Sequence, residues 1–264
     1  MGVRLASGDT EVVLDAEHGG RLASLRVEGL ELLVTDAREA TGWGCFVMAP
    51  YAGRIRNGMF RFAGREHHLP LTLPPHAGHG TVFDAAWRVE HAEATDAVLV
   101  TPLVEPWPWS GRVVHRVRVR PDGVELRLEV WADDEPFPAS CGWHPWWRRR
   151  LDRGAPLLLG VEAGAVWERG DDDIPTGELV APPPGPWDDC FTDLGGPPVL
   201  RWPGALAVEV HTTCMDVVVF DEPDHAVAVE PQTGPPDALR LAPVVVEPGL
   251  PLVAEASFVW KKSP

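Results

Sequence analysis

Short segments in which hydrophobic and polar residues alternate run through the whole chain. In residues 113–120 valines alternate mainly with arginines, the turn sequence Pro121-Asp122-Gly123 follows, and in residues 124–130 valines and leucines alternate with charged residues. A period of two places successive side chains on opposite faces of a strand. The pattern predicts a β-hairpin with one core face and one charged face, whose arginines lie across from glutamates as a solvated ladder without function.

The same alternation recurs from end to end, and no long segment with a period of 3.6 residues interrupts it. Glycine and proline, at 26 and 28 residues, are scattered between the apolar runs and indicate many turns. We therefore predict an all-β protein with one domain over residues 1–264, and we interpret the proline tract 182–186 as an internal loop rather than a linker. The strands predicted outside the hairpin are Val12–Leu14, Arg21–Val27, Leu30–Val34, Phe60–Phe62, Trp87–His91, Val98–Leu103, Leu157–Val161, Val208–His211, Val217–Phe220, Ala226–Val229, Val244–Val246 and Leu252–Trp260.

Charge and cysteine usage narrow the class of protein. Asp and Glu number 39 against 23 Lys and Arg, a formal charge of -16, which repels phosphate backbones and anionic lipids and argues against nucleic acid and membrane surfaces as partners. The four cysteines lie far apart, without zinc spacing or a dense disulfide framework. With no signal-peptide-like start and no membrane-span window, we expect a soluble, cytoplasmic protein, monomeric or homodimeric.

Glu230 follows an apolar segment in which Val227 and Val229 alternate with alanines, the pattern of a buried strand. Prolines at 231, 235 and 236 come next, so we expect the strand to end at Glu230 and the carboxylate to point away from the core from a rigid element. A carboxylate held in this way on a rigid strand is well placed to act as a catalytic base. A solvated glutamate at the end of a strand is the alternative.

Three further stretches carry candidate functional residues. Arg54 and His79 lie in glycine-flanked turns, where polar side chains can converge on a ligand, although either residue can also be an ordinary turn residue. His144 lies among Trp143, Trp146 and Trp147, and a histidine beside aromatic rings suits a neutral ligand such as a sugar. A core cluster of tryptophans is the alternative.

The third stretch holds the paired aspartates Asp188 and Asp189 beside Trp187. A carboxylate at this position can accept hydrogen bonds from ligand hydroxyls, or it can cap a turn after the proline-rich tract.

Taken in order, these motifs resemble the aldose 1-epimerases, also called galactose mutarotases. The resemblance rests on Arg54-Ile55 with Gly58 and Phe60, His79-Gly80 with Phe83-Asp84 and Trp87, His144-Pro145, Asp188, and Glu230-Pro231-Gln232, and it spans most of the chain. It implies a large antiparallel β-sandwich of the galactose mutarotase type and an isomerase of carbohydrate metabolism that interconverts the α and β anomers of free aldoses without a cofactor or metal.

The resemblance also assigns roles by position. Glu230 corresponds to the base on the anomeric hydroxyl, His144 to the acid at the ring oxygen and His79 to a second histidine on the ring-oxygen side. Arg54 and Asp188 correspond to residues that bind sugar hydroxyls, and Trp143 and Trp146 are our candidates for the aromatic wall. The chain departs from the family pattern at Gly53, where many members have Asn, and at Trp146-Trp147, where Tyr or Phe is common, which bears on the identity of the sugar.

The reaction itself requires a base at the C1 hydroxyl and an acid at the ring oxygen, and we expect the two groups to flank the ring. The sequence shows neither a metal-ligand spacing nor a glycine-rich phosphate loop. Three other functions remain open: a glycoside hydrolase using Glu230 and Asp188, a sugar-binding module, and an epimerase of a phosphorylated hexose in which Arg148 to Arg150 supply cationic groups at the rim.

Overall fold

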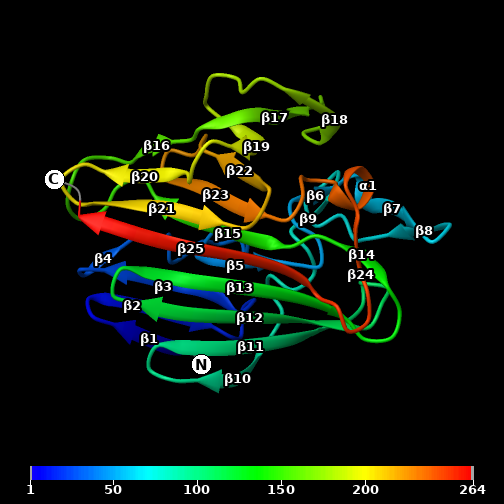
Figure 1. Cartoon of the computed structure of the whole chain (residues 1–264), viewed down its shortest axis with the longest axis horizontal. Coiled ribbons are helices and arrows are strands. Elements are labelled where there is room, and N and C mark those ends of the chain that lie inside the picture. The colour runs from blue at the N-terminus through cyan, green and yellow to red at the C-terminus, as the bar shows by residue number, and fades with distance from the viewer. Residues whose placement is uncertain (1, 263–264) are drawn as a thin grey trace.

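The computed structural model describes residues 2–262 and consists mainly of two large antiparallel β-sheets, which Figure 1 shows as two layers. The larger sheet has eleven strands. Its order is β1 (Gly2–Ser7), β2 (Thr10–Asp15), β3 (Arg21–Val27), β5 (Cys45–Met48), β15 (Gly142–Arg148), β23 (Ala226–Gln232), β22 (Asp216–Phe220), β19 (Asp188–Leu194), β17 (Ala163–Arg169) and β18 (Pro175–Val180), with β4 (Leu30–Glu31) paired to β3.

The second sheet has eight strands, in the order β10 (Arg88–Ala92), β11 (Asp96–Leu103), β12 (Gly111–Arg120), β13 (Gly123–Ala132), β25 (Leu252–Lys262), β21 (Leu206–Thr212), β20 (Val199–Trp202) and β16 (Leu158–Gly160). Three two-stranded sheets complete the β-structure. They pair β14 (Phe137–Ala139) with β24 (Val244–Val246), β6 (Arg54–Ile55) with β9 (Ala77–Gly78), and β7 (Met59–Phe62) with β8 (Arg65–His68). The helical elements are η1 (Arg56–Gly58) and α1 (Ala238–Leu241).

The main hydrophobic core includes side chains from facing strands of both large sheets. On β15, Trp143 and Trp147 are fully buried in this core, where the Trp147 ring meets Phe258 of β25 edge-on at a centroid distance of 4.9 Å. The intervening residues His144 and Trp146 point to the opposite face of the same strand, because strand side chains alternate. That outer face carries the candidate site.

The predicted all-β class is confirmed, and the hairpin and most strand positions agree with the structure. The turn at Pro121-Asp122-Gly123 joins β12 to β13. Arg118 lies across from Glu125 as predicted, whereas Arg116 pairs with Arg127 instead of a glutamate. The proline tract lies between β18 and β19 of one sheet, so it is an internal loop. Among residues 2–262 the one α-helix has four residues, and no helix has the length and hydropathy to cross a membrane.

One local prediction was wrong. Glu230 does not end its strand, because β23 continues through Pro231 to Gln232 and Glu230 is only 3% exposed. The recorded pairs between β15 and β23 skip residues 143–145 and 229–231. Pro231 has no N–H to donate. Because the ladder to β15 is open at this position, no backbone hydrogen bond is lost there, and the proline is tolerated inside the sheet.

Candidate active site

Two neighbouring rows of residues cross the outer face of the eleven-stranded sheet. The pairs Gly142–Gln232 and Trp146–Ala228 fix the register of β15 against β23 and place His144 opposite Glu230. From β5 to β17 the first row runs through Phe46, His144, Glu230, Val218, Cys190 and Trp167. The second row runs through Trp146, Ala228, Phe220, Asp188 and, in the same register, Arg169.

These rows form much of the wall of a cavity of about 320 Å³, to which β6 contributes Arg54 and loops contribute Thr41, Gly53, Leu73, His79, Asp173 and Pro236. Six residues proposed from the sequence line it together: Arg54, His79, His144, Trp146, Asp188 and Glu230. They come from distant parts of the chain, and the sheet register brings them to one place. The volume is at the small end of ligand pockets and suits a ligand the size of a single sugar ring.

His144 and Glu230 are in direct contact at the floor of this cavity. Nε2 of His144 lies 3.1 Å from Oε1 of Glu230, and both side chains are about 95% buried. Burial raises the pKa of Glu230 well above its ordinary value, and nearby Asp188 adds to the rise. Burial likewise lowers the pKa of His144 well below its ordinary value, with a further contribution from His79. Both shifts favour an uncharged pair in which one proton lies between the two side chains.

His79 approaches the same pair from the loop that follows β9. Its ring meets the His144 ring edge-on, with centroids 5.3 Å apart, and its buried Nδ1 has no hydrogen-bond partner within residues 2–262. Burial, and secondarily the charge of Arg54, lower the pKa of His79 to about 4. His79 has a positive φ of 63°, an uncommon backbone angle for a residue other than glycine, and it adopts this angle where it lines the cavity.

Charged side chains of both signs alternate at the other end of the cavity. Oδ2 of Asp188 lies 3.5 Å from Nη2 of Arg54 and 3.4 Å from Nη1 of Arg169. Asp173, from the loop between β17 and β18, lies 3.9 Å from each of the two guanidinium groups. The arginines hold Asp188 in place while its side chain stays 21% exposed, so this carboxylate can accept hydrogen bonds from ligand hydroxyls.

Aromatic rings form a second part of the wall. The Trp146 ring lies 4.8 Å from the His144 ring and meets Phe220 edge-on at 5.9 Å, while its Nε1 donates a hydrogen bond of 2.7 Å to the carbonyl of Thr41. Trp167 also lines the cavity. Aromatic rings that line a cavity beside hydrogen-bonding groups suit the apolar faces and polar edges of a sugar.

The prediction for Trp143 was wrong. Its side chain points to the other face of β15, is fully buried in the inter-sheet core, and donates a hydrogen bond of 3.1 Å to Nε2 of His115. The odd and even positions of a strand face opposite ways, so Trp143 cannot share a wall with Trp146.

The cationic rim proposed from Arg148 to Arg150 does not border the cavity either. Arg149 instead donates hydrogen bonds to the carbonyls of Pro223 and Asp221, and Arg150 is exposed elsewhere. Arg169 and Trp167 are among the cavity residues that the sequence reasoning missed. Their signal was weak but present, because both occupy alternate positions of the segment Ala163–Arg169 and therefore share one face.

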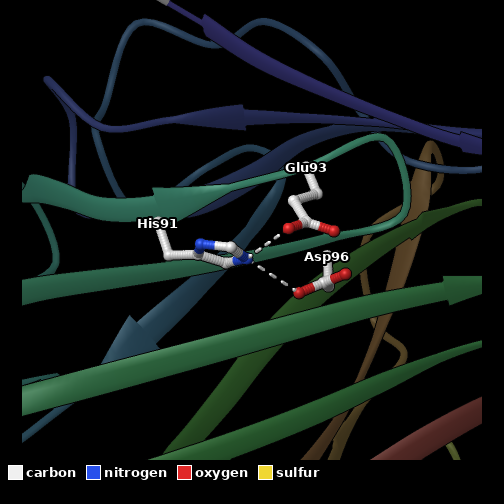
Figure 2. Close-up of side chains that lie close together, drawn as sticks. All are labelled: His91, Glu93 and Asp96. Carbon is white, nitrogen blue, oxygen red and sulfur yellow. Dashed lines mark ion pairs between the residues drawn. The ribbon is translucent and has the colours of Figure 1, made fainter.

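Away from the cavity, Figure 2 shows the one group of three candidate metal ligands among residues 2–262, at the turn between β10 and β11. Nε2 of His91 lies 3.7 Å from Oε1 of Glu93 and 3.3 Å from Oδ1 of Asp96. These side chains already pair with one another, and those of His91 and Glu93 are largely exposed at 46% and 68%. We interpret the group as surface ion pairs.

The fold is a β-sandwich of the mutarotase type, and comparison with known proteins agrees. The family model for aldose 1-epimerase matches residues 2–193. The chain therefore belongs to the aldose 1-epimerase family. Among curated relatives, it is 25% identical over 185 residues to the uncharacterized protein YihR of Escherichia coli, an alignment covering 66% of this chain and 59% of YihR. The chain thus spans about three fifths of that relative.

Solved structures support the same fold at low sequence identity. A candidate aldose 1-epimerase of Escherichia coli superposes with a TM-score of 0.87 at 19% identity, covering 99% of both chains. The GalM/aldose epimerase homologue of C. elegans gives a TM-score of 0.84 at 16% identity, covering 100% of this chain and 99% of the other. Galactose 1-epimerase of Lactobacillus acidophilus gives 0.81 at 14% identity, covering 98% and 93%.

Proposed function

We propose that this protein is an aldose 1-epimerase that interconverts the α and β anomers of a free aldose in the cavity on the eleven-stranded sheet. The observation that carries the proposal is the buried contact between His144 and Glu230, 3.1 Å from Nε2 to Oε1, at the floor of a cavity walled by aromatic rings and hydrogen-bonding groups. Paired acid and base groups beside a sugar-sized space are what ring opening requires.

The pair can carry the reaction with a single proton. Proton transfer from Glu230 to His144 converts the uncharged pair into its ion-pair form. In that form the Glu230 carboxylate accepts the proton of the C1 hydroxyl while protonated His144 donates to the ring oxygen and the bond from C1 to that oxygen breaks. The products are the open aldehyde, protonated Glu230 and neutral His144. Rotation about the C1–C2 bond and the reverse transfers give the other anomer and restore the starting proton, so charge and protons balance.

The contact between the two groups modifies our expectation that acid and base flank the ring. A distance of 3.1 Å leaves no space for a sugar between them. The C1 hydroxyl and the ring oxygen are bonded to the same carbon, so neighbouring groups on one side reach both. In this arrangement the His79 ring supports the His144 ring edge-on. Arg54 and Asp188 bind hydroxyls of the sugar, and Trp146 packs against the sugar ring.

The charges in the cavity favour a neutral sugar over a phosphorylated one. Arg54 and Arg169 face four acidic residues, namely Asp173, Asp188, Asp189 and Glu230. Both arginines are already paired with Asp188, and the arginine run expected to bind phosphate lies elsewhere. A phosphate group would meet repulsion and find no free cation among the lining residues. A sugar-binding module without catalysis is the second candidate function.

Exchange NMR between anomers, on D-glucose, D-galactose and their 6-phosphates, tests the proposal. We expect the protein to accelerate anomer exchange of at least one free aldose above the spontaneous rate and to act more weakly on its 6-phosphate. Saturable binding of a free sugar without acceleration would favour the binding module. Preference for the phosphate ester would contradict the neutral substrate.

A further inference from the structure

Arg21, at the start of β3, is a fully buried cation behind the site. Its side chain is 0% exposed, and it has no ion-pair partner among residues 2–262. Asp84 and Asp15 act on it only at longer range, and burial lowers its pKa to about 10. Burying an unpaired guanidinium is costly, so other contacts must compensate for the lost hydration.

Four backbone carbonyls supply this compensation. Nε of Arg21 donates to His18 O at 2.8 Å, Nη1 to Ala40 O at 2.5 Å and Trp43 O at 3.0 Å, and Nη2 to Phe83 O at 2.7 Å. The carbonyls belong to three separate segments: the turn before β3, the loop between β4 and β5, and the loop between β9 and β10. A planar group with five donors can connect three segments in this way, whereas an ammonium cannot.

Two of these segments lead directly to the cavity. Thr41, between the two carbonyls held by Nη1, lines the cavity and accepts the hydrogen bond from Nε1 of Trp146. Phe83, whose carbonyl binds Nη2, packs against Phe46 with ring centroids 6.1 Å apart. Movement of the guanidinium would therefore move the support of the aromatic wall.

Phe46 separates the cation from the proposed acid. The central carbon of the Arg21 guanidinium lies 5.5 Å from the Phe46 ring centroid, and the same ring stacks on His144 at 4.6 Å and 20°. These two distances place the charge within about 10 Å of the imidazole, across an aromatic ring instead of water.

We propose that Arg21 is a positioning residue of this active site, which fixes the loops behind the cavity and, through Phe46, holds His144 in place and disfavours a proton on it. The groups that face His144 are Glu230 from β23, His79 from the loop after β9, and Arg21 behind Phe46 of β5; Arg54 and Asp188 act on its partner Glu230. The positive charge adds to the effects of burial and of His79 on the pKa of His144. The activity readouts below rest on the proposed function, and the NMR readout does not.

Two variants separate the geometric role from the charge. Arg21→Lys keeps the charge but cannot reach all four carbonyls, and Arg21→Met removes the charge at similar length. Arg149→Lys is the matched control, because Arg149 also donates to backbone carbonyls and lies directly after β15, outside the cavity. Each folded variant is assayed for kcat and KM of anomer exchange on D-galactose or D-glucose across pH, and the His144 pKa is measured by NMR.

We expect both Arg21 variants to lower kcat by about 10- to 100-fold, with a smaller change in KM, because a displacement of about 1 Å has effects of this size. Arg21→Met should also raise the His144 pKa and move both limbs of the pH profile upward by about one pH unit, whereas Arg21→Lys should leave them in place. Folded Arg21 variants with wild-type kcat and an unchanged His144 pKa would overturn the proposal and leave Arg21 a purely structural residue.

Phe46→Leu keeps the test decisive if Arg21→Met does not fold. This variant leaves Arg21 and its four hydrogen bonds in place but removes the ring that stacks on His144. We expect kcat to fall by about tenfold or more while thermal stability falls only as for one truncated core ring. Wild-type kcat in Phe46→Leu would contradict the connection through that ring. If no aldose is turned over by the wild-type protein, the proposed function fails, while the NMR comparison still decides the effect of Arg21 on His144.

Discussion

Strand β15 separates two regions that each contain a buried histidine beside a tryptophan. In the inter-sheet core, His115 contacts Trp143; on the outer face, His144 contacts Trp146. Burial lowers the pKa of both imidazoles, that of His115 to about 4. The two histidines are alike in their burial, in their contact with a tryptophan ring and in the direction of their pKa shifts.

They differ in how the ring nitrogens are satisfied. Nδ1 of His115 donates to the carbonyl of Gly20 at 3.0 Å, and its Nε2 accepts from Trp143 at 3.1 Å, which fixes one neutral tautomer. Nε2 of His144 instead faces a carboxylate, and its Nδ1 has no partner among the described residues. A fully satisfied buried histidine is structural, whereas an incompletely satisfied one beside an ionisable group and a cavity is a candidate for chemistry.

Of the substitutions that test this difference, Glu230→Gln should have the largest effect on kcat. The amide nearly matches the carboxylate in size and can still hydrogen-bond a C1 hydroxyl, but it cannot take up a proton at neutral pH. We expect kcat of anomer exchange to fall by at least about 100-fold, with little change in sugar affinity measured by calorimetry. Wild-type exchange in this variant would remove the base from the mechanism and favour the binding module.

His144→Gln and His115→Gln should separate the two histidines. We expect His144→Gln to lower kcat by about 100-fold with a small effect on unfolding. His115→Gln should leave kcat of the folded protein nearly unchanged and lower the free energy of unfolding by about 1–3 kcal/mol, because it disturbs a satisfied buried hydrogen-bond pair. Rate measurements combined with urea unfolding check both, and a large loss of kcat in folded His115→Gln would break the comparison.

Lowering the pH should reduce the stability of the folded protein, because His115 stays neutral when buried. Its pKa is about 4 in the folded protein against an ordinary value of 6.5, so the unfolded chain binds more protons between these values. The contribution to stability is fully present above about pH 6.5, and up to about 3 kcal/mol is lost as the pH falls to about 4. Urea unfolding across this range should show a steeper loss for the wild type than for His115→Gln. Equal slopes would show that His115 does not resist protonation.

The smallest effect should come from the arginines outside the cavity. Arg150→Ala should leave stability within about 0.5 kcal/mol and anomer exchange on a free aldose unchanged, since this exposed side chain does not line the cavity. Arg169→Met, in contrast, should raise KM by about tenfold by releasing Asp188 from one of its two arginines. Steady-state kinetics on both variants check this. A larger loss from Arg150→Ala than from Arg169→Met would contradict the placement of the cavity.

The sequence predicts the fold class well because alternation and turn residues are local signals. The segment Arg21–Val27 and the turn at Pro121-Asp122-Gly123 were found correctly for this reason. The sequence alone could not predict which face of β15 points outward, since Trp143 and Trp146 are both apolar and both buried. The strand end expected at Glu230 failed because prolines usually stop a ladder, and the open register beside Pro231 depends on the neighbouring strand.

Candidate residues recognised by motif were placed in the cavity, while those without a motif were missed. Arg169 and Trp167 reach the cavity only because β17 pairs with β19 in one particular register. Arg21 lies early in the chain and far in sequence from His144, and its closeness to Phe46 follows from the pairing of β3 with β5. Such contacts depend on tertiary structure and leave no local pattern.

Because the two rows of site residues depend on strand register, the activity of this protein would depend on correct strand pairing. A slip of one residue in β15 would turn His144 and Trp146 toward the inter-sheet core and bring Trp143 and Trp147 to the cavity face, so the cavity would lose the proposed acid and its aromatic neighbour together. The specific activity of refolded protein, divided by its β-sheet signal, would then count the fraction of molecules whose strands have paired correctly.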